Sequence, residues 1–170
     1  MVITLTKEEA RWAMEVGKRR HDECVRKGYR QTDGTFSGNG EVNHMRGAAA
    51  ELAVAKFLGW QWGATVNTFN DVPDLGEAVE VRSHVRHQRY LRLKQVNDSE
   101  KNDKRNSIFV SVARLGDQRF RIQGWAYGRE AMFDAYLVEK DPQSHKPEWH
   151  FPIEKLHSPE SLIEVVPVTL

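Results

Sequence analysis

The spacing of apolar residues changes once along this chain, near residue 59, and this change restricts the fold more than any other feature. Before it, the segments 6–27 and 41–58 carry apolar residues at helical spacing. The first segment opens with the capping box Thr6-Lys7-Glu8-Glu9. A glycine follows the last residue of each segment, Gly28 after the first and Gly59 after the second. After it, five segments are typical of strands: 60–66, 78–86, 90–96, 107–114 and 119–127. Helices followed by a run of strands predict an α+β domain.

The length of 170 residues predicts a single domain, 1–170, because such a chain can bury roughly two-thirds of its unfolded surface. We expect an N-terminal helix and a flexible, glycine-rich loop in 1–40, and the core of the domain in 41–135. A short helix is expected at 128–132. The remainder, 136–170, is expected to be a packed tail with little regular structure and a late β-like run at 163–168.

Composition indicates a globular protein, with 39% hydrophobic and 29% charged residues. No apolar run approaches the roughly 18 residues of a membrane span, so no membrane partner is expected. The first residues lack the apolar core of a signal peptide, and Cys24 is the single cysteine. Together these features predict a cytoplasmic protein without disulfides or a cysteine-based zinc site.

The segment 79–86 has one apolar and one charged face, because strand side chains alternate. Val79, Val81, Ser83 and Val85 share the first face, and Glu80, Arg82, His84 and Arg86 share the second. We expect the valines in the core and the charged face toward a cleft or solvent.

The next strand, 90–96, is expected to form a hairpin with 79–86 that aligns the apolar faces of both. This register places Lys94 opposite Arg82 and Arg92 opposite His84. Like charges facing each other are unfavourable, so the cluster should attract Glu80, an aspartate from 71–74, or a phosphate. The whole segment 82–105 has eight Lys/Arg against three acids, which suits either a polyanion or a solvated hairpin.

Three further carboxylates are candidates for the same region. Glu51 lies among small apolar residues of the second helix, where it either points to solvent or has a metal or basic partner. Asp71 and Asp74 precede the strand across the Gly76 turn. They are either ordinary turn residues or, with Glu80, oxygen ligands for Mg²⁺ or Mn²⁺.

The combination of Glu51 in GAAAELAVAKFLG, Pro73-Asp74 and Glu80-Val81-Arg82 resembles the PD-(D/E)XK, or restriction-endonuclease-like, nuclease superfamily. The later RFRIQGWAYGREA and the tail WHFPIEKLHSPESL also look like phage-type proteins with an "EVR" or "EVK" strand. The resemblance covers about 41–160. It implies a central mixed β-sheet of about four to five strands flanked by the two N-terminal helices.

The resemblance also implies Mg²⁺- or Mn²⁺-dependent hydrolysis of DNA phosphodiesters by a phage-encoded endo- or exodeoxyribonuclease in a bacterial cytoplasm. Asp74 and Glu80 would be metal ligands, Glu51 would bind the metal directly or through water, and Asp71 competes with Asp74.

The departure from the superfamily pattern lies at Arg82, which occupies the position of the lysine. Arginine stays protonated and cannot act as a general base, although it can orient water or clamp a phosphate. Either the metal activates water unaided, or Lys94 supplies the ammonium, or the site is inactive; His84 could also accept a proton.

DNA is the expected partner, and a set of basic residues is expected to bind it: Arg46, His84, Arg86, Arg92, Lys101, Lys104 and Arg105. The alternative is a catalytically inactive module of the same fold that binds nucleic acid or a host protein. A homodimer is compatible with either.

Overall fold

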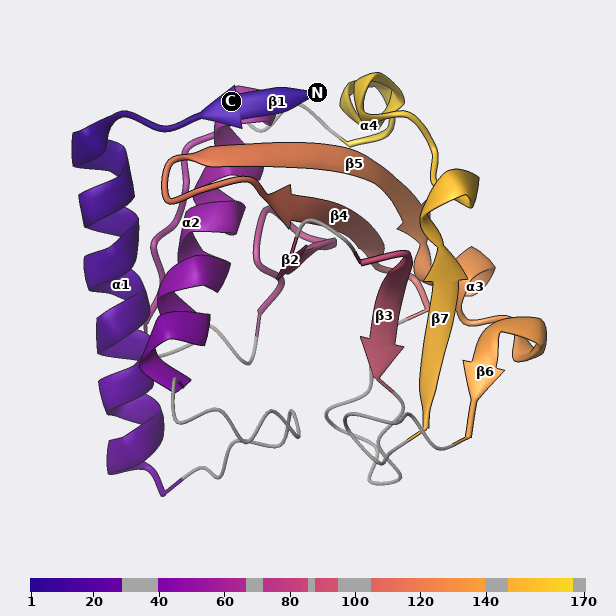
Figure 1. Cartoon of the computed structure of the whole chain (residues 1–170), viewed down its shortest axis with the longest axis horizontal. Coiled ribbons are helices and arrows are strands. Elements are labelled where there is room, and N and C mark those ends of the chain that lie inside the picture. The colour runs from indigo at the N-terminus through magenta and orange to yellow at the C-terminus, as the bar shows by residue number, and fades with distance from the viewer. Residues whose placement is uncertain (29–39, 67–71, 86–87, 95–104, 140–146, 167–170) are drawn as a thin grey trace.

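The computed structural model describes residues 1–28, 40–66, 72–85, 88–94, 105–139 and 147–166 (Figure 1). The chain is an α+β protein, as the order of its segments predicts. Its helices are α1 (Lys7–Arg26), α2 (Gly40–Leu58), α3 (Gly128–Ala131) and α4 (Pro159–Val165), with short 3₁₀ turns at Asp134–Tyr136 and Ile153–Lys155. Its strands are β1 (Val2–Thr4), β2 (Val79–Val85), β3 (Tyr90–Lys94), β4 (Ile108–Arg114), β5 (Arg119–Tyr127), β6 (Leu137–Val138) and β7 (Glu148–Pro152).

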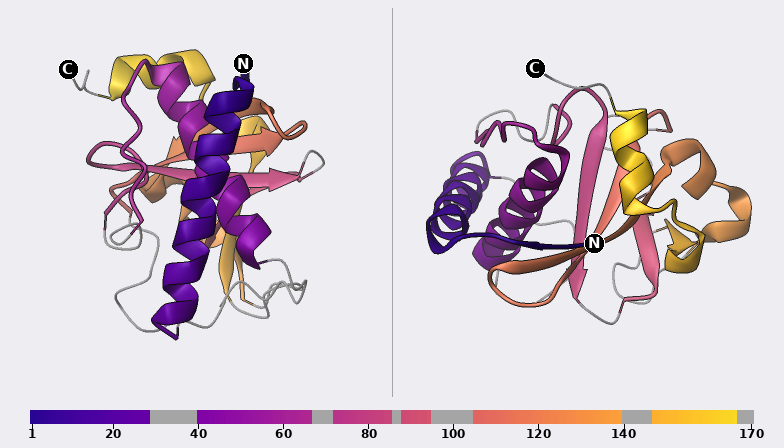
Figure 2. Two further views of the ribbon diagram at one scale, coloured as in Figure 1. Left: turned by 90° about the vertical axis from the view of Figure 1, so that its left-hand side faces the viewer. Right: turned by 90° about the horizontal axis from the view of Figure 1, so that it is seen from above.

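The strands form two sheets. Sheet A has the order β1-β5-β4-β2 and is mixed, because β2 runs parallel to β4 while the other neighbours are antiparallel. Sheet B is antiparallel, with the order β3-β7-β6. Figure 2 shows α1 and α2 side by side, with α2 between α1 and sheet A.

The helix α2 is buried on all sides over its second half, since every residue from Ala48 to Ala55 is buried. Such a helix must have partners all round, and here α1 and sheet A provide them. The two helices approach closely at Gly17, where an added Cβ would lie 2.6 Å from the carbonyl oxygen of His44. Gly17 on α1 and the alanines of α2 therefore allow the two helices and sheet A to pack closely.

The alternation of β2 is confirmed from Val79 to Arg82, whereas Ser83 on the valine face is exposed. Val79 and Val81 are 2% and 9% exposed and join the core with α1 and α2. The side chains of Glu80, Arg82 and His84 on the other face are partly exposed. This second face lies on the side of Phe109, which is buried with residues of sheet B, so β2 separates the helix core from the second layer.

The predicted hairpin of β2 and β3 is wrong. β2 pairs in parallel with β4, and β3 pairs with β7, where Leu91 lies opposite Phe151 and Leu93 opposite Trp149. Alternation determines which face of a strand is buried, but it does not determine the neighbouring strand. The predicted partner β2 and the observed partner β7 both have an apolar face that could align with that of β3. The same leucines are fully buried in the second sheet, so the pattern alone could not select the partner.

Two further expectations fail. Residues 60–66 form no strand. Trp60 lies against the turn at Gly76 instead, and the ring of Trp62 lies 4.9 Å from that of Trp12 on α1. The region 136–170 holds regular structure, because Trp149 and Phe151 alternate as a strand and Ser158-Pro159 starts α4 with a side-chain cap and a proline at its first turn. The helix α4 extends to Val165, so the β-like run expected from 163 does not begin there. Of the loop expected at 28–40, residues 29–39 lie outside the described residues, and Gly40 already belongs to α2.

Candidate active site

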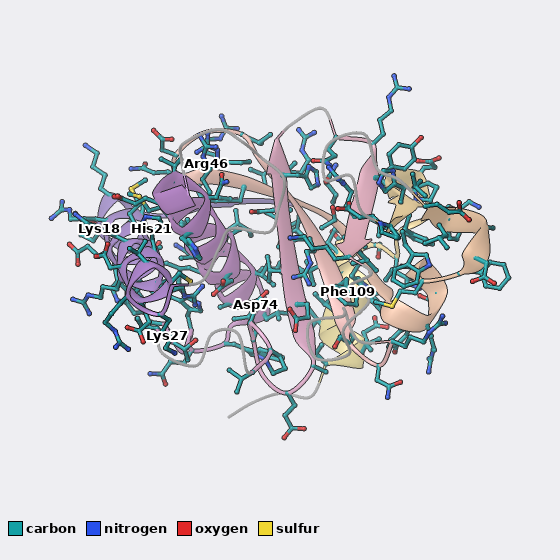
Figure 3. The ribbon with its side chains drawn as sticks, turned by 90° about the horizontal axis from the view of Figure 1, so that it is seen from below. Lys18, His21, Lys27, Arg46, Asp74 and Phe109 are labelled. Atoms are coloured by element: carbon teal, nitrogen blue, oxygen red, sulfur yellow. The ribbon has the colours of Figure 1, made fainter. Side chains whose placement is uncertain are left out.

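At the charged face of β2, two carboxylate groups lie close to one guanidinium group. The Nη1 atom of Arg82 lies 3.3 Å from Oε2 of Glu80 and 3.9 Å from Oδ2 of Asp74. These side chains are 18% to 30% exposed, so the cluster is open to solvent. Figure 3 shows Asp74 beside β2. The structure thus brings together the proline-aspartate bend and the Glu-Val-Arg strand.

The bend holds Asp74 in place through its backbone. Leu75 and Val79 exchange two hydrogen bonds of 3.0 and 3.2 Å, and Oδ2 of Asp74 accepts the N–H of Val81 at 2.7 Å. Gly76 has a φ of +56°, and an added Cβ would lie 2.9 Å from the ring of Trp60. A residue with a side chain would be strained there and would also meet the indole. Asp74 is therefore a turn residue that also closes part of the free edge of β2.

Glu51 is buried and paired. Its side chain is 6% exposed and forms a bidentate pair with the guanidinium of Arg20, at 2.5 and 2.8 Å. The indole N–H of Trp62 donates to Oε2 at 3.2 Å, and Nε of Arg20 donates to the carbonyl of Thr65 at 2.7 Å. The expectation that Glu51 points to solvent is wrong, and the expectation of a basic partner is confirmed. Both of its oxygens are engaged within the protein.

Burial raises the pKa of Glu51 above its ordinary value, and the negative charge of Asp74 acts in the same direction. The hydrogen bonds from Arg20 and Trp62 oppose this rise. Asp74 is thus near enough to Glu51 for the two charges to repel each other.

A polar chain continues the site across sheet A. Nε2 of His84 lies 2.9 Å from Oγ of Ser111 on β4, and this hydroxyl lies 3.1 Å from Oε1 of Gln123 on β5. The guanidinium of Arg82 lies over the ring of Phe109, 5.2 Å from its centroid. Neighbouring strands thus fix His84 and Arg82, and the charged face of β2 becomes a row of oriented groups.

The structure does not place the other predicted basic residues in this cluster. Lys94 is opposite Glu148 in sheet B, so the hairpin register that assigned it to the site is wrong. Arg92 is bound to Glu148 at 2.7 Å and does not lie opposite His84. Both corrections follow from the pairing of β3 with β7.

Of the remaining candidates, Arg46 lies on α2 and is partly buried, and its Nε has no hydrogen-bond partner among the described residues. Figure 3 shows it at the end of α2 where the helix begins, away from Asp74. Arg105 is exposed, just before β4. Four candidates lie outside the described residues: Asp71, Arg86, Lys101 and Lys104.

Sequence reasoning missed Arg20, Trp62, Ser111 and Gln123. For Arg20 a signal was present, because it follows Ala13, Val16 and Gly17 on the buried stripe of α1. A charged residue on such a stripe needs a buried partner, and Glu51 is its counterpart on α2. The polar chain of Ser111 and Gln123 gave no comparable signal.

A divalent cation fits this arrangement only with help from water and substrate. The described part of the chain holds no group of three His, Cys, Asp or Glu side chains able to hold a metal. One oxygen of Asp74 and one of Glu80 lie within 4.0 Å of the same atom, Nη1 of Arg82. Mg²⁺ typically uses one or two carboxylates together with waters and substrate phosphates, so two ligands are sufficient.

No protein family, curated protein or solved structure matches this chain. Within the part of the chain that the structure describes, no helix is long and apolar enough to cross a membrane.

Proposed function

We propose that the protein is a Mg²⁺- or Mn²⁺-dependent nuclease that hydrolyses DNA phosphodiester bonds at the charged face of β2. The observation that carries this proposal is the meeting of Asp74 and Glu80 on Arg82, with Glu51 in electrostatic reach. Two partly exposed carboxylates beside a guanidinium provide ligands for a hard cation and a partner for a phosphate. The resemblance to PD-(D/E)XK nucleases, stated above from sequence, supports the same chemistry.

The four polar residues of this site each have a role in the proposal. Asp74 and Glu80 would hold the metal, which would supply Lewis-acid activation of water and of the scissile phosphate. Arg82 binds a phosphate oxygen and neutralises the charge that develops on it. His84, held on Ser111, binds the substrate backbone or accepts a proton.

Glu51 takes a different role from the one that the resemblance implies. Because Arg20 and Trp62 engage both of its oxygens, it does not contact the metal in this arrangement. We assign it to the support of the site: with Arg20 it joins α1, α2 and the carbonyl of Thr65.

A second candidate function is DNA binding without cleavage. It is favoured by Arg82, which already neutralises both carboxylates and so reduces their affinity for a metal. The two functions differ in metal binding: the nuclease binds Mn²⁺, and the binding module has salt-sensitive affinity for DNA without a metal.

The test is cleavage of end-labelled single- and double-stranded DNA in Mg²⁺ or Mn²⁺, combined with Mn²⁺ titration calorimetry. We expect Glu80→Ala and Asp74→Asn to lower cleavage at least about 100-fold, because each removes a metal ligand. Glu77→Ala is the matched control, since Glu77 is an exposed glutamate on the same turn. Its cleavage should equal that of the wild type.

Arg82→Ala separates the two roles of the guanidinium. Removal of a competing cation should tighten Mn²⁺ binding at Asp74 and Glu80, while loss of the phosphate contact should lower cleavage. Wild-type protein that neither binds Mn²⁺ nor cleaves DNA refutes the nuclease proposal. Cleavage that survives Glu80→Ala assigns the activity to a different site.

A further inference from the structure

The outer face of sheet B carries an exposed aromatic ring next to fixed basic residues. Leu91, Leu93, Trp149 and Phe151 point into the buried cluster, so their neighbours in sequence point outward. Tyr90 on this outer face is 42% exposed, and its ring is stacked on His150 with 5.4 Å between centroids and 29° between planes. The imidazole thus supports a tyrosine ring of which a large part is open to solvent.

A buried carboxylate organises this face. Glu148 is 3% exposed and accepts hydrogen bonds from Nε and Nη2 of Arg92, at 2.8 and 2.7 Å. Its Oε2 also lies 3.8 Å from Nε2 of His150. Burial of a carboxylate is costly unless it is paired, so the two hydrogen bonds hold the guanidinium of Arg92 in a fixed orientation, with the imidazole of His150 next to the pair.

Positive charge follows the same strand. Arg89 and Lys94 are exposed at the two ends of β3, and Arg92 lies between them with its side chain 22% exposed. Aromatic rings that stack on bases, beside cations that contact the backbone, are the recurrent means of binding single-stranded nucleic acid. A duplex offers no unstacked base to such a ring.

We propose that Tyr90, supported by His150, stacks on an unpaired base of single-stranded DNA while Arg92 and Lys94 contact its phosphates. The surface lies on the same side of sheet A as the carboxylates, because Leu91 and Leu93 share a buried cluster with Phe109, over which Arg82 lies. The inference rests on the proposed function for its substrate class, and it names the strand form that the site receives: DNA with a single-stranded segment.

Fluorescence polarisation in EDTA tests this without cleavage, with a fluorescein-labelled 20-nucleotide poly-dT and a blunt 20-base-pair duplex as probes. Tyr90→Ala should weaken binding of the single strand about 5- to 100-fold, and Tyr90→Phe should leave it within about 2-fold of the wild type. Phe133→Ala, at an aromatic residue that is 62% exposed outside sheet B, is the control and should have no effect. Thermal melts check that each variant is folded.

Two results overturn the inference: wild-type affinity of Tyr90→Ala for poly-dT, or an equal loss of affinity for the duplex. Glu80→Ala separates this inference from the proposed function. If that variant and the wild type bind poly-dT equally through Tyr90 but neither cleaves DNA, the stacking site stands and the nuclease proposal fails. If cleavage depends on Glu80 while Tyr90→Ala binds poly-dT with wild-type affinity, the nuclease proposal stands and the stacking site is refuted.

Discussion

Replacement of Arg20 by methionine isolates the energetic role of the buried ion pair. The variant Arg20→Met keeps a long apolar side chain but removes two hydrogen bonds to Glu51 and one to the carbonyl of Thr65. The carboxylate of Glu51 then keeps the indole N–H of Trp62 as its remaining donor among the contacts described above. Removal of one partner from a buried pair costs about 3–5 kcal/mol in free energy of unfolding. For a chain of this size that corresponds to a decrease of about 6–20 °C in Tm.

The double variant Arg20→Met/Glu51→Met is the matched control. Replacement of both charges by apolar groups of similar volume is often neutral, so the double variant should be more stable than Arg20→Met alone. Urea denaturation and thermal melts, both followed by circular dichroism, measure the stability of the two variants. The reasoning is refuted if Arg20→Met melts within about 2 °C of the wild type, or if the double variant is no more stable than the single one.

The pH dependence provides a second measurement on the same pair. Burial raises the pKa of Glu51 above 4.5, so between pH 4.5 and the folded pKa the native state holds more protons than the unfolded state. Its contribution to the free energy of unfolding therefore falls as pH rises through this window. Loss of Arg20 raises the folded pKa further. The stability deficit of Arg20→Met relative to the wild type should therefore be smaller near pH 4.5 than at pH 8.

Three further substitutions test the packing. Gly17→Ala should lower the free energy of unfolding by at least about 1–3 kcal/mol in urea denaturation, because its Cβ would meet the backbone of α2 at Met45. Gly47→Ala is its control in a helix without neighbours in reach, and it should be neutral or stabilising by up to about 1 kcal/mol. Gly124→Ala should cost about 1–3 kcal/mol or more in the same assay, because φ is +150° and the new Cβ would meet the carbonyl of His157.

Local patterns in the sequence were sufficient for the first two helices and for β2, β4 and β5 of sheet A, but not for β1. The capping box at Thr6 is formed as predicted, with the side chain of Glu9 accepting the N–H of Thr6. Val79 and Val81 of β2 are buried, whereas Glu80 and Arg82 are partly exposed, as alternation requires. These features depend on neighbours in sequence, so periodicity and capping chemistry determine them.

Pairings between distant segments could not be obtained in the same way. β3 satisfies its apolar face with β7, more than fifty residues later in the chain, and no local signal distinguishes this from a hairpin with β2. In the tail, Trp149 and Phe151 alternate as in a strand, but the prolines nearby led to the prediction of little regular structure. For the site, the motif located Asp74, Glu80 and Arg82, but the partner of Glu51 came from α1, which the motif does not include.

The charges of the candidate site divide into a fixed part and an exchangeable part. Arg20 and Glu51 are about 95% buried and neutralise each other, so neither can respond to a ligand without unfolding their surroundings. Arg82 holds Asp74 and Glu80 with its side chain 30% exposed and at distances of 3.9 and 3.3 Å, which are longer than those of the buried pair. A solvent-exposed contact of this length contributes little stability and can be replaced at low cost. Under the proposed function, a metal and a phosphate would replace this contact, the metal taking the carboxylates and the phosphate taking the guanidinium.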